Sequence, residues 1–218
     1  MSAKDEVVKI ITEMAGSYTP YQIFCDWVKM SAISIQNVCC MFHDSAWKKR
    51  EQDYIDIMAK YDLKQQLMFS KMLNLLEEEF SQNIDDVLGE IFMAAGCGNK
   101  QTGQFFTPFI LSKLTSRITI PENVSEDKPL FMNEPSVGAG GMIIATAKLL
   151  YEKNINYQRC MKVVANDLDW NAVYMAYLQF SLLGIDAEIM QGDTLELKLA
   201  TCPKDRILRT PRRMGALI

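Results

Sequence analysis

The sequence predicts an α/β protein in which a helical N-terminal domain, residues 1–98, precedes a partial sheet domain, residues 99–218, of three or four mostly parallel strands with flanking helices. Up to about residue 98, apolar residues repeat at the helical period. After residue 99, short apolar runs alternate with helical ones, a pattern typical of βαβ units and a parallel sheet. The 218 residues, 49% of them apolar, suffice for one sizeable domain with a substantial appendage.

Caps and apolar spacing predict the helices of the first region. One should begin at Thr19-Pro20-Tyr21-Gln22, which combines a capping threonine, proline at the first helical position and glutamine three residues after the cap. We expect it to turn inward Ile23, Trp27 and Met30. Leucines predict a second helix: Leu63, Leu67, Leu75 and Leu76. A third, ending at Gly96 or Gly98, follows the stripe Ile84, Val87, Leu88, Ile91, Phe92 and Ala95.

Three strands are predicted in the second region, in the runs PLFMN at 129–133, KVVAND at 162–167 and AEIMQGD at 187–193. Helices are expected over 141–151 and 171–183, followed by an irregular tail whose last five residues, Met-Gly-Ala-Leu-Ile, are a candidate fourth strand. The stretch 135–141, here called the glycine turn, therefore lies between the first strand and its helix.

Composition and charge argue against several classes of protein and site. Residues 1–99 carry nine Lys/Arg against fifteen Asp/Glu, which excludes a nucleic-acid clamp there. Six basic residues after residue 197 face only Asp205, and either phosphate binding or a solvated loop would explain them. With no signal peptide and no long apolar run, we expect a cytoplasmic protein without membrane contact. The only histidine, His43, has no ligand-like neighbours, so no metal site is expected; the six cysteines should be reduced.

Polar residues at three successive strand ends indicate a nucleotide-type cofactor site. Glycines in the first turn let a ligand approach the backbone, although G-x-G-G is neither the dinucleotide fingerprint nor a phosphate-binding P-loop. Asp167 ends the second strand, where a carboxylate can accept from both ribose hydroxyls, and Trp170 offers a flat face to an adenine. Asp193 follows the third strand. Each acid alone also fits a helix cap or a solvated loop.

These residues resemble the S-adenosylmethionine-dependent DNA adenine-N6 methyltransferases, particularly the modification subunits of type I restriction systems. Gly103-Gln104-Phe105-Phe106-Thr107-Pro108 is similar to the family's G-[EQ]-[FY]-[FY]-T-P segment, although Thr107 capping a helix with Pro108 at its first position would also explain it. The loop from Glu134 to Gly141 resembles D-P-[AS]-C-G-[ST]-G-G, with Glu for Asp and Val for Cys. Gly192-Asp193-Thr194-Leu195 matches G-D-[ST]-L, and Asp-Val-Leu-Gly at 86–89 resembles the helix entering the catalytic domain.

The resemblance implies a Rossmann-like methyltransferase domain over residues 99–218 that binds S-adenosylmethionine. Phe106, Thr107 and Pro108 would contact the methionine end, Glu134 the amino group, Asp167 the ribose and Asp193 the adenine. Together the residues and the resemblance predict these cofactor-binding positions: Phe106, Thr107, Pro108, Glu134, Ser136, Gly138, Gly140, Gly141, Asp167, Trp170, Asp193 and Leu195.

The family's base-binding motif, [ND]-P-P-[FY], is missing from this sequence. In the family its side chain and carbonyl accept hydrogen bonds from the target adenine, whose flipped base stacks on the aromatic ring. Cofactor binding is therefore implied more strongly than catalysis, no catalytic residue is assigned, and the domain is expected to be incomplete. Two functions lead: adenine-N6 methylation of DNA with a partner supplying the base-binding half, or an inactive cofactor-binding subunit of a restriction-modification-type system. A small-molecule methyltransferase ranks below them, because it would explain the missing motif but not the Gln-Phe-Phe-Thr-Pro segment. A homo- or hetero-oligomer, or else the N-terminal helices, is expected to cover the open sheet edge.

Overall fold

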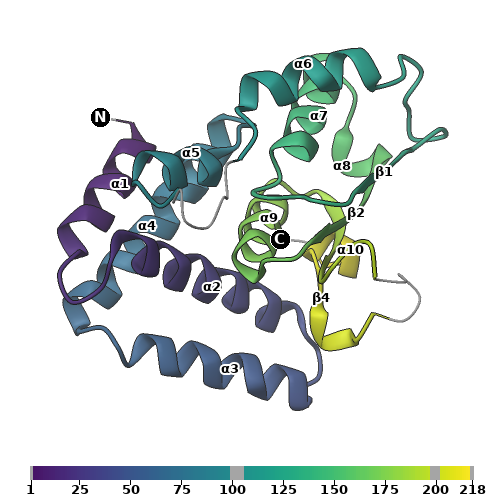
Figure 1. Ribbon diagram of the computed structural model, residues 1–218. Helices are drawn as coiled ribbons and strands as arrows, with labels where there is room; N and C mark the ends of the chain where they lie inside the picture. The colour runs from purple at the N-terminus through teal and green to yellow at the C-terminus, as the bar shows by residue number, and fades with distance from the viewer. Residues whose placement is uncertain (1, 99–105, 197–201, 217–218) are drawn as a thin grey trace. The chain divides into compact units, whose positions relative to one another are not determined.

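The computed structural model of the chain describes residues 2–98, 106–196 and 202–216. It divides into two compact units (Figure 1). The helical unit comprises Met1–Asn83 and Val87–Phe105, and the sheet unit comprises Ile84–Asp86 and Phe106–Ile218. The three residues Ile84–Asp86 thus belong to the sheet unit although the helical unit surrounds them in the sequence. Among the described residues, no helix is both long enough and apolar enough to cross a membrane.

The helical unit contains α1 (Ala3–Met14), α2 (Pro20–Cys39), α3 (Ser45–Met58), α4 (Leu63–Gln82) and α5 (Val87–Ala94). The predicted start of α2 is confirmed, because Thr19 Oγ1 accepts from Gln22 N at 3.2 Å and Thr19 N donates to Gln22 Oε1 at 3.0 Å. Its residues Ile23, Trp27 and Met30 are buried as expected.

The predicted second helix is confirmed as α4, on which all four leucines lie; its buried face runs through Phe69, Met72, Leu76 and Phe80, while Leu63 and Leu67 are 72% and 64% exposed. Two details of the third predicted helix are wrong, because Ile84 precedes α5 and Ala95 follows it. Near the other end, Gly96 has a φ of 69°, the left-handed conformation that commonly ends a helix.

The sheet unit contains the three predicted strands, β1 (Leu130–Glu134), β2 (Met161–Asp167) and β3 (Asp186–Gln191), which pair in parallel in that order. Its helices are α6 (Phe109–Thr119), α7 (Gly141–Glu152), α8 (Tyr157–Cys160) and α9 (Trp170–Leu182). The expected α/β class with a mostly parallel sheet is confirmed.

The two faces of the sheet differ in polarity because side chains alternate along each strand. One face carries buried apolar residues, Val163, Ala165, Ala187 and Ile189, and α9 packs on β2 and β3. The other face carries charges where the strands begin: Lys162, the second residue of β2, is paired in register with Asp186, the first residue of β3, and its Nζ donates to Asp186 Oδ2 at 2.5 Å.

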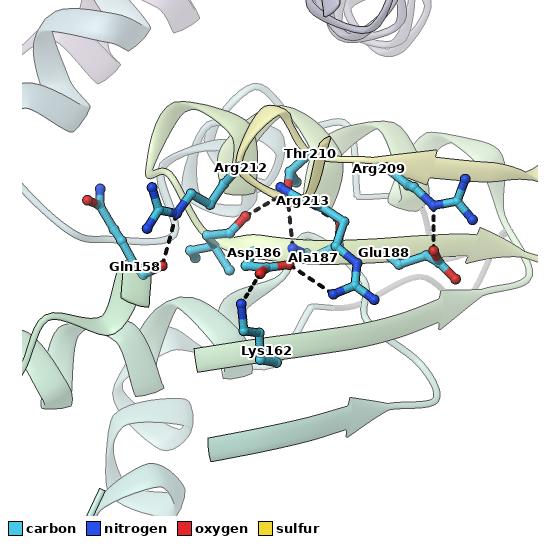
Figure 2. A network of polar contacts seen from close by, with 10 residues as sticks. Gln158, Lys162, Asp186, Ala187, Glu188, Arg209, Thr210, Arg212 and Arg213 are labelled. Atoms are coloured by element: carbon cyan, nitrogen blue, oxygen red, sulfur yellow. Dashed lines mark hydrogen bonds and ion pairs between the residues drawn. The ribbon is translucent and has the colours of Figure 1, made fainter. Parts of the chain in front are cut away.

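The C-terminal tail adds β4 (Ile207–Arg209), antiparallel to β3, after a short 3-10 helix η2 (Lys204–Arg206), and then α10 (Pro211–Met214). The expectation of a fourth strand beginning at Met214 is wrong, since Met214 ends α10 and Gly215 is left-handed with φ 75°. Thr210 attaches the tail to the sheet: its hydroxyl donates to Ile185 O at 2.7 Å and accepts from Ala187 N at 3.0 Å (Figure 2).

Two arginines of the tail pair with acidic residues of β3, and a third contacts α8 (Figure 2). Arg209 Nε donates to Glu188 Oε2 at 2.6 Å, and Arg213 Nη1 lies 3.4 Å from Asp186 Oδ1. Arg212 Nε donates to Gln158 O at 3.2 Å. These arginines therefore fasten β4 and α10 to the rest of the sheet unit, a role that neither phosphate binding nor a solvated loop anticipated.

Candidate cofactor site

The loops that follow β1, β2 and β3 are hydrogen-bonded to one another at the carboxyl edge of the sheet. Val137 N donates to Asn166 O at 2.9 Å, which joins the glycine turn to the end of β2. Asn166 Nδ2 and Gly192 O, 2.6 Å apart, join β2 to the loop after β3. Thr194 Oγ1 donates to Pro135 O at 2.6 Å, which joins the loop after β3 to the glycine turn. Three predicted site segments are thus brought together, at the edge where open α/β sheets bind ligands.

Asp167 lies at the centre of this arrangement. Its Oδ2 accepts from Gly138 N at 2.8 Å, and its Oδ1 accepts from Asp169 N at 3.0 Å. Because a carboxylate can accept about four hydrogen bonds, each oxygen keeps capacity for a further donor such as a ribose hydroxyl. The side chain is therefore fixed by backbone before any ligand arrives.

The three glycines of the turn each face a side chain of the protein. A Cβ on Gly138, whose φ is +54°, would lie 3.0 Å from the Phe106 ring, which brings the Phe106 segment beside the turn. At Gly140, φ +101°, it would lie 2.5 Å from the ring of Phe180, and at Gly141 it would lie 3.1 Å from Asp86 Oδ2. Gly140 is thus required by internal packing and by its positive φ, whatever ligand is bound, and Gly141 allows the close approach of Asp86.

Glu134 ends β1 and is half-buried. Its Oε1 accepts from Ser136 N at 3.2 Å. Burial raises the pKa of the Glu134 carboxyl above 4.5; the Ser136 N–H partly offsets this rise, and the negative charge of Asp167 adds to it. Two carboxylates near one edge create a negative potential that favours a cationic ligand.

Trp170 begins α9, directly after Asp169, whose side chain caps the helix by accepting from Asn171 N at 3.0 Å. The indole stacks on Tyr174, with ring centroids 5.2 Å apart and 26° between the planes. Tyr174 thus supports one face of the indole.

Asp193 and Leu195 lie in the exposed loop after β3. Asp193 Oδ1 accepts from Leu195 N at 2.9 Å, so the carboxylate shapes its own turn, while the Leu195 residue is 96% exposed.

The start of α6 differs from the alternative interpretation in which Thr107 caps the helix and Pro108 is its first residue. Pro108, not Thr107, occupies the N-cap position, and α6 begins at Phe109 without a side-chain cap. Thr107 and Pro108 are exposed. Gly103, Gln104 and Phe105, which carry part of the resemblance, lie outside the described residues.

Sequence reasoning missed the contact that Gln179 makes with the glycine turn. Its Nε2 donates to Ala139 O at 2.7 Å and to Asp86 Oδ1 at 2.8 Å, and both Gln179 and Asp86 are buried. One signal was available, since Gln179 is a lone amide in the apolar stretch VYMAYLQF.

Comparison with known proteins identifies the family. The sequence profile named N-6 DNA Methylase matches residues 83–210, more than half of the chain. The chain belongs to the N-6 DNA methylase family. The match includes Asp86, the glycine turn and the ends of β2 and β3, and the expected family is thereby confirmed.

One solved structure supports the fold of this N-6 DNA methylase family member. The type I restriction-modification system methyltransferase subunit from Streptococcus thermophilus is similar with a TM-score of 0.50 at 11% identity, over 93% of this chain and 60% of that one. A putative class I S-adenosylmethionine-dependent methyltransferase from Listeria monocytogenes has a TM-score of 0.43 at 14% identity, over 79% and 55%. This chain therefore spans 60% of the length of the S. thermophilus subunit. No curated protein sequence matches it.

Proposed function

We propose that the chain binds S-adenosylmethionine at the carboxyl edge of β1, β2 and β3. The proposal rests on the carboxylate of Asp167, which accepts hydrogen bonds from Gly138 N and Asp169 N and can accept further ones from a ligand. Asp167 lies within the region matched by the methylase family. The residues present fit the cofactor, because its ammonium and sulfonium groups are cationic and Glu134 and Asp167 supply negative charge. Glu134 would hold the amino group, Asp167 the ribose hydroxyls and Asp193 the adenine amine.

The proposed reaction is methyl transfer to the N6 amine of adenine in DNA. The cofactor supplies an activated methyl group on its sulfonium, and this chain's residues fix where that group stands. Catalysis of this kind depends chiefly on positioning of the two reactants. Because the sequence has no [ND]-P-P-[FY] motif, we propose that a partner subunit supplies the contacts to the flipped adenine. Acting on DNA, the protein would work in the cytoplasm.

Two surfaces of the sheet unit support a partner. Within the described residues, no strand pairs with the outer edge of β1, whose Phe131 is 76% exposed. The outer face of α6 exposes an apolar stripe at helical spacing: Ile110, Leu111, Leu114 and Ile118, each at least 50% exposed. An open edge and an apolar helix face are features that proteins usually cover. We propose that a homo- or hetero-oligomer covers them.

A second candidate function rests on the same site and on the absent motif. An inactive subunit would bind the cofactor and act through assembly with a restriction-modification-type partner. Methylation of unmethylated plasmid DNA, tested with the purified chain alone and with the product of the neighbouring gene, separates the two. Methylation in either case supports the enzyme, whereas cofactor binding without methylation supports the assembly subunit.

Cofactor identity is tested by calorimetry with S-adenosylmethionine and, in parallel, with NAD. We expect binding of the first only. Binding of NAD, or of neither, would refute the proposed site.

Sedimentation measures the oligomeric state and so tests the proposed partner. If the wild-type chain is an oligomer and Leu114→Glu is a monomer, the result supports an interface on α6. If the wild-type chain is a monomer that does not bind the product of the neighbouring gene, the result contradicts that interface.

A further inference from the structure

The segment Ile84–Asp86 contacts the glycine turn from outside the predicted cofactor residues. It is separated from the rest of the sheet unit by the stretch Val87–Phe105, yet it packs within that unit. Asp85 Oδ1 accepts from Lys148 Nζ of α7 at 2.7 Å, and both side chains are partly exposed. Asp86 is only 4% exposed and points the other way, toward Gln179 of α9 and Gly141 at the start of α7.

Gln179 transmits the position of Asp86 to the turn. Its side-chain nitrogen has two hydrogens, and it donates to both Asp86 Oδ1 at 2.8 Å and Ala139 O at 2.7 Å. Ala139 lies between Gly138 and Gly140, which both have positive φ. The Gln179 amide therefore fixes the peptide carbonyl at the middle of the turn, and the carboxylate of Asp86 fixes the rotation of that amide.

The second carboxylate oxygen of Asp86 lies beside the first residue of α7. A Cβ on Gly141 would be 3.1 Å from Asp86 Oδ2. Negative charge near the first turn of a helix is stabilising, because the unpaired N–H groups there carry partial positive charge. Asp86 thus acts on both ends of the stretch from Ala139 to Gly141.

We infer that Asp86 is a positioning residue which, through Gln179, sets the conformation of the glycine turn and thereby the affinity for S-adenosylmethionine. The inference rests on the proposed function. It assigns to Asp86 no contact with the cofactor; it rests on the hydrogen bond between Asp86 and Gln179 and on the position of Asp86 Oδ2 beside Gly141.

The experiment compares the dissociation constant for S-adenosylmethionine in full-length variants by calorimetry. Asp86→Leu, similar in size but without acceptors, should weaken binding about tenfold or more, the usual effect of a hydrogen bond to a charged group. Asp86→Asn keeps one acceptor for Gln179 and should recover most of the affinity. Gln179→Met, which removes the donor instead, should weaken binding to a similar degree.

Two neighbouring substitutions serve as controls. Asp85→Asn removes a partly exposed ion pair one residue away. Ser112→Ala removes a buried hydroxyl whose Oγ lies 3.6 Å from the Gly141 Cβ position and has no hydrogen-bond partner within the described residues. Both should bind like wild type. The double variant Asp86→Leu with Gln179→Met should be no weaker than either single variant, because the two residues act as one unit.

The outcomes are distinguishable. If the wild-type chain does not bind S-adenosylmethionine, the proposed function fails. If wild type binds and Asp86→Leu and Gln179→Met bind equally well, only the positioning role is refuted. Should Asp86→Leu not fold, Gln179→Met and Asp86→Asn still decide: normal affinity in Gln179→Met refutes the inference. Equal losses in both controls would also refute it, since any change near α7 would then have the same effect.

Discussion

Asp167→Ala removes the carboxylate that joins β2 to the glycine turn. Two hydrogen bonds from backbone N–H groups are lost, from Gly138 at 2.8 Å and from Asp169 at 3.0 Å. Hydrogen bonds to charged groups each contribute about 1.5–3 kcal/mol when buried. Because Asp167 is only half-buried, we expect the free energy of unfolding to fall by about 1–2 kcal/mol. Loss of the proposed ribose contacts should weaken S-adenosylmethionine binding by about 1–3 kcal/mol, roughly 5- to 150-fold in Kd.

Asp193→Ala is the matched comparison, because Asp193 is exposed and, among the described residues, its carboxylate accepts from Leu195 N of its own turn. It should weaken binding to a similar degree while leaving the free energy of unfolding nearly unchanged. Calorimetry gives the two dissociation constants, and urea unfolding followed by circular dichroism gives the stabilities. Normal binding by both variants would show that the site is misassigned. A stable Asp167→Ala protein would refute the structural role of the two backbone bonds.

Three further predictions follow from the same structure. Gly138→Val should abolish S-adenosylmethionine binding without unfolding the chain, because φ +54° and a contact of 3.0 Å with Phe106 leave no room for a branched side chain; wild-type affinity would remove the turn from the site. Binding of the cationic cofactor should weaken as pH falls. Because the pKa of the Glu134 carboxyl is raised above its ordinary value of 4.5, this carboxyl becomes protonated, and the weakening begins, at a pH above 4.5. Calorimetry at a series of pH values should show this weakening in wild type and not in Glu134→Gln. Arg212→Glu with Arg213→Glu should lower the urea midpoint, because Arg213 pairs with Asp186, and should weaken DNA binding and flatten its salt dependence if the tail also meets phosphates; unchanged DNA binding would leave the tail only its structural role.

The order of β1 to β3 and their helices could be predicted because each element is indicated by the apolar pattern of its own residues. Apolar runs of five to seven residues, the first two each followed by a helical stretch, predicted β1 to β3 with α7 and α9. The cap at Thr19 was equally local. By contrast, β4 depends on Thr210 and on ion pairs with residues more than 20 positions earlier, and no local pattern distinguishes such a strand from an irregular tail.

In the candidate site, too, features that depend on local sequence could be predicted and contacts between distant segments could not. The strand-end residues could be proposed from their positions alone, since the carboxyl ends of parallel strands meet at one edge. What stands opposite each glycine could not, because Phe106, Phe180 and Asp86 come from distant parts of the chain. The residues that contact the cofactor stay a prediction until binding is measured.

The position of Asp86 in the sequence affects how the chain can be divided for experiments. A fragment beginning at residue 99, the natural choice if the helices are regarded as a separate module, would retain every predicted cofactor-binding residue and still lack the acceptor for the Gln179 amide. A Gln179 side chain without that acceptor would lose one of the contacts that orient its amide toward Ala139 O. Poor cofactor affinity in such a fragment would then reflect a missing internal contact, and adding back residues 84–98 is the appropriate comparison.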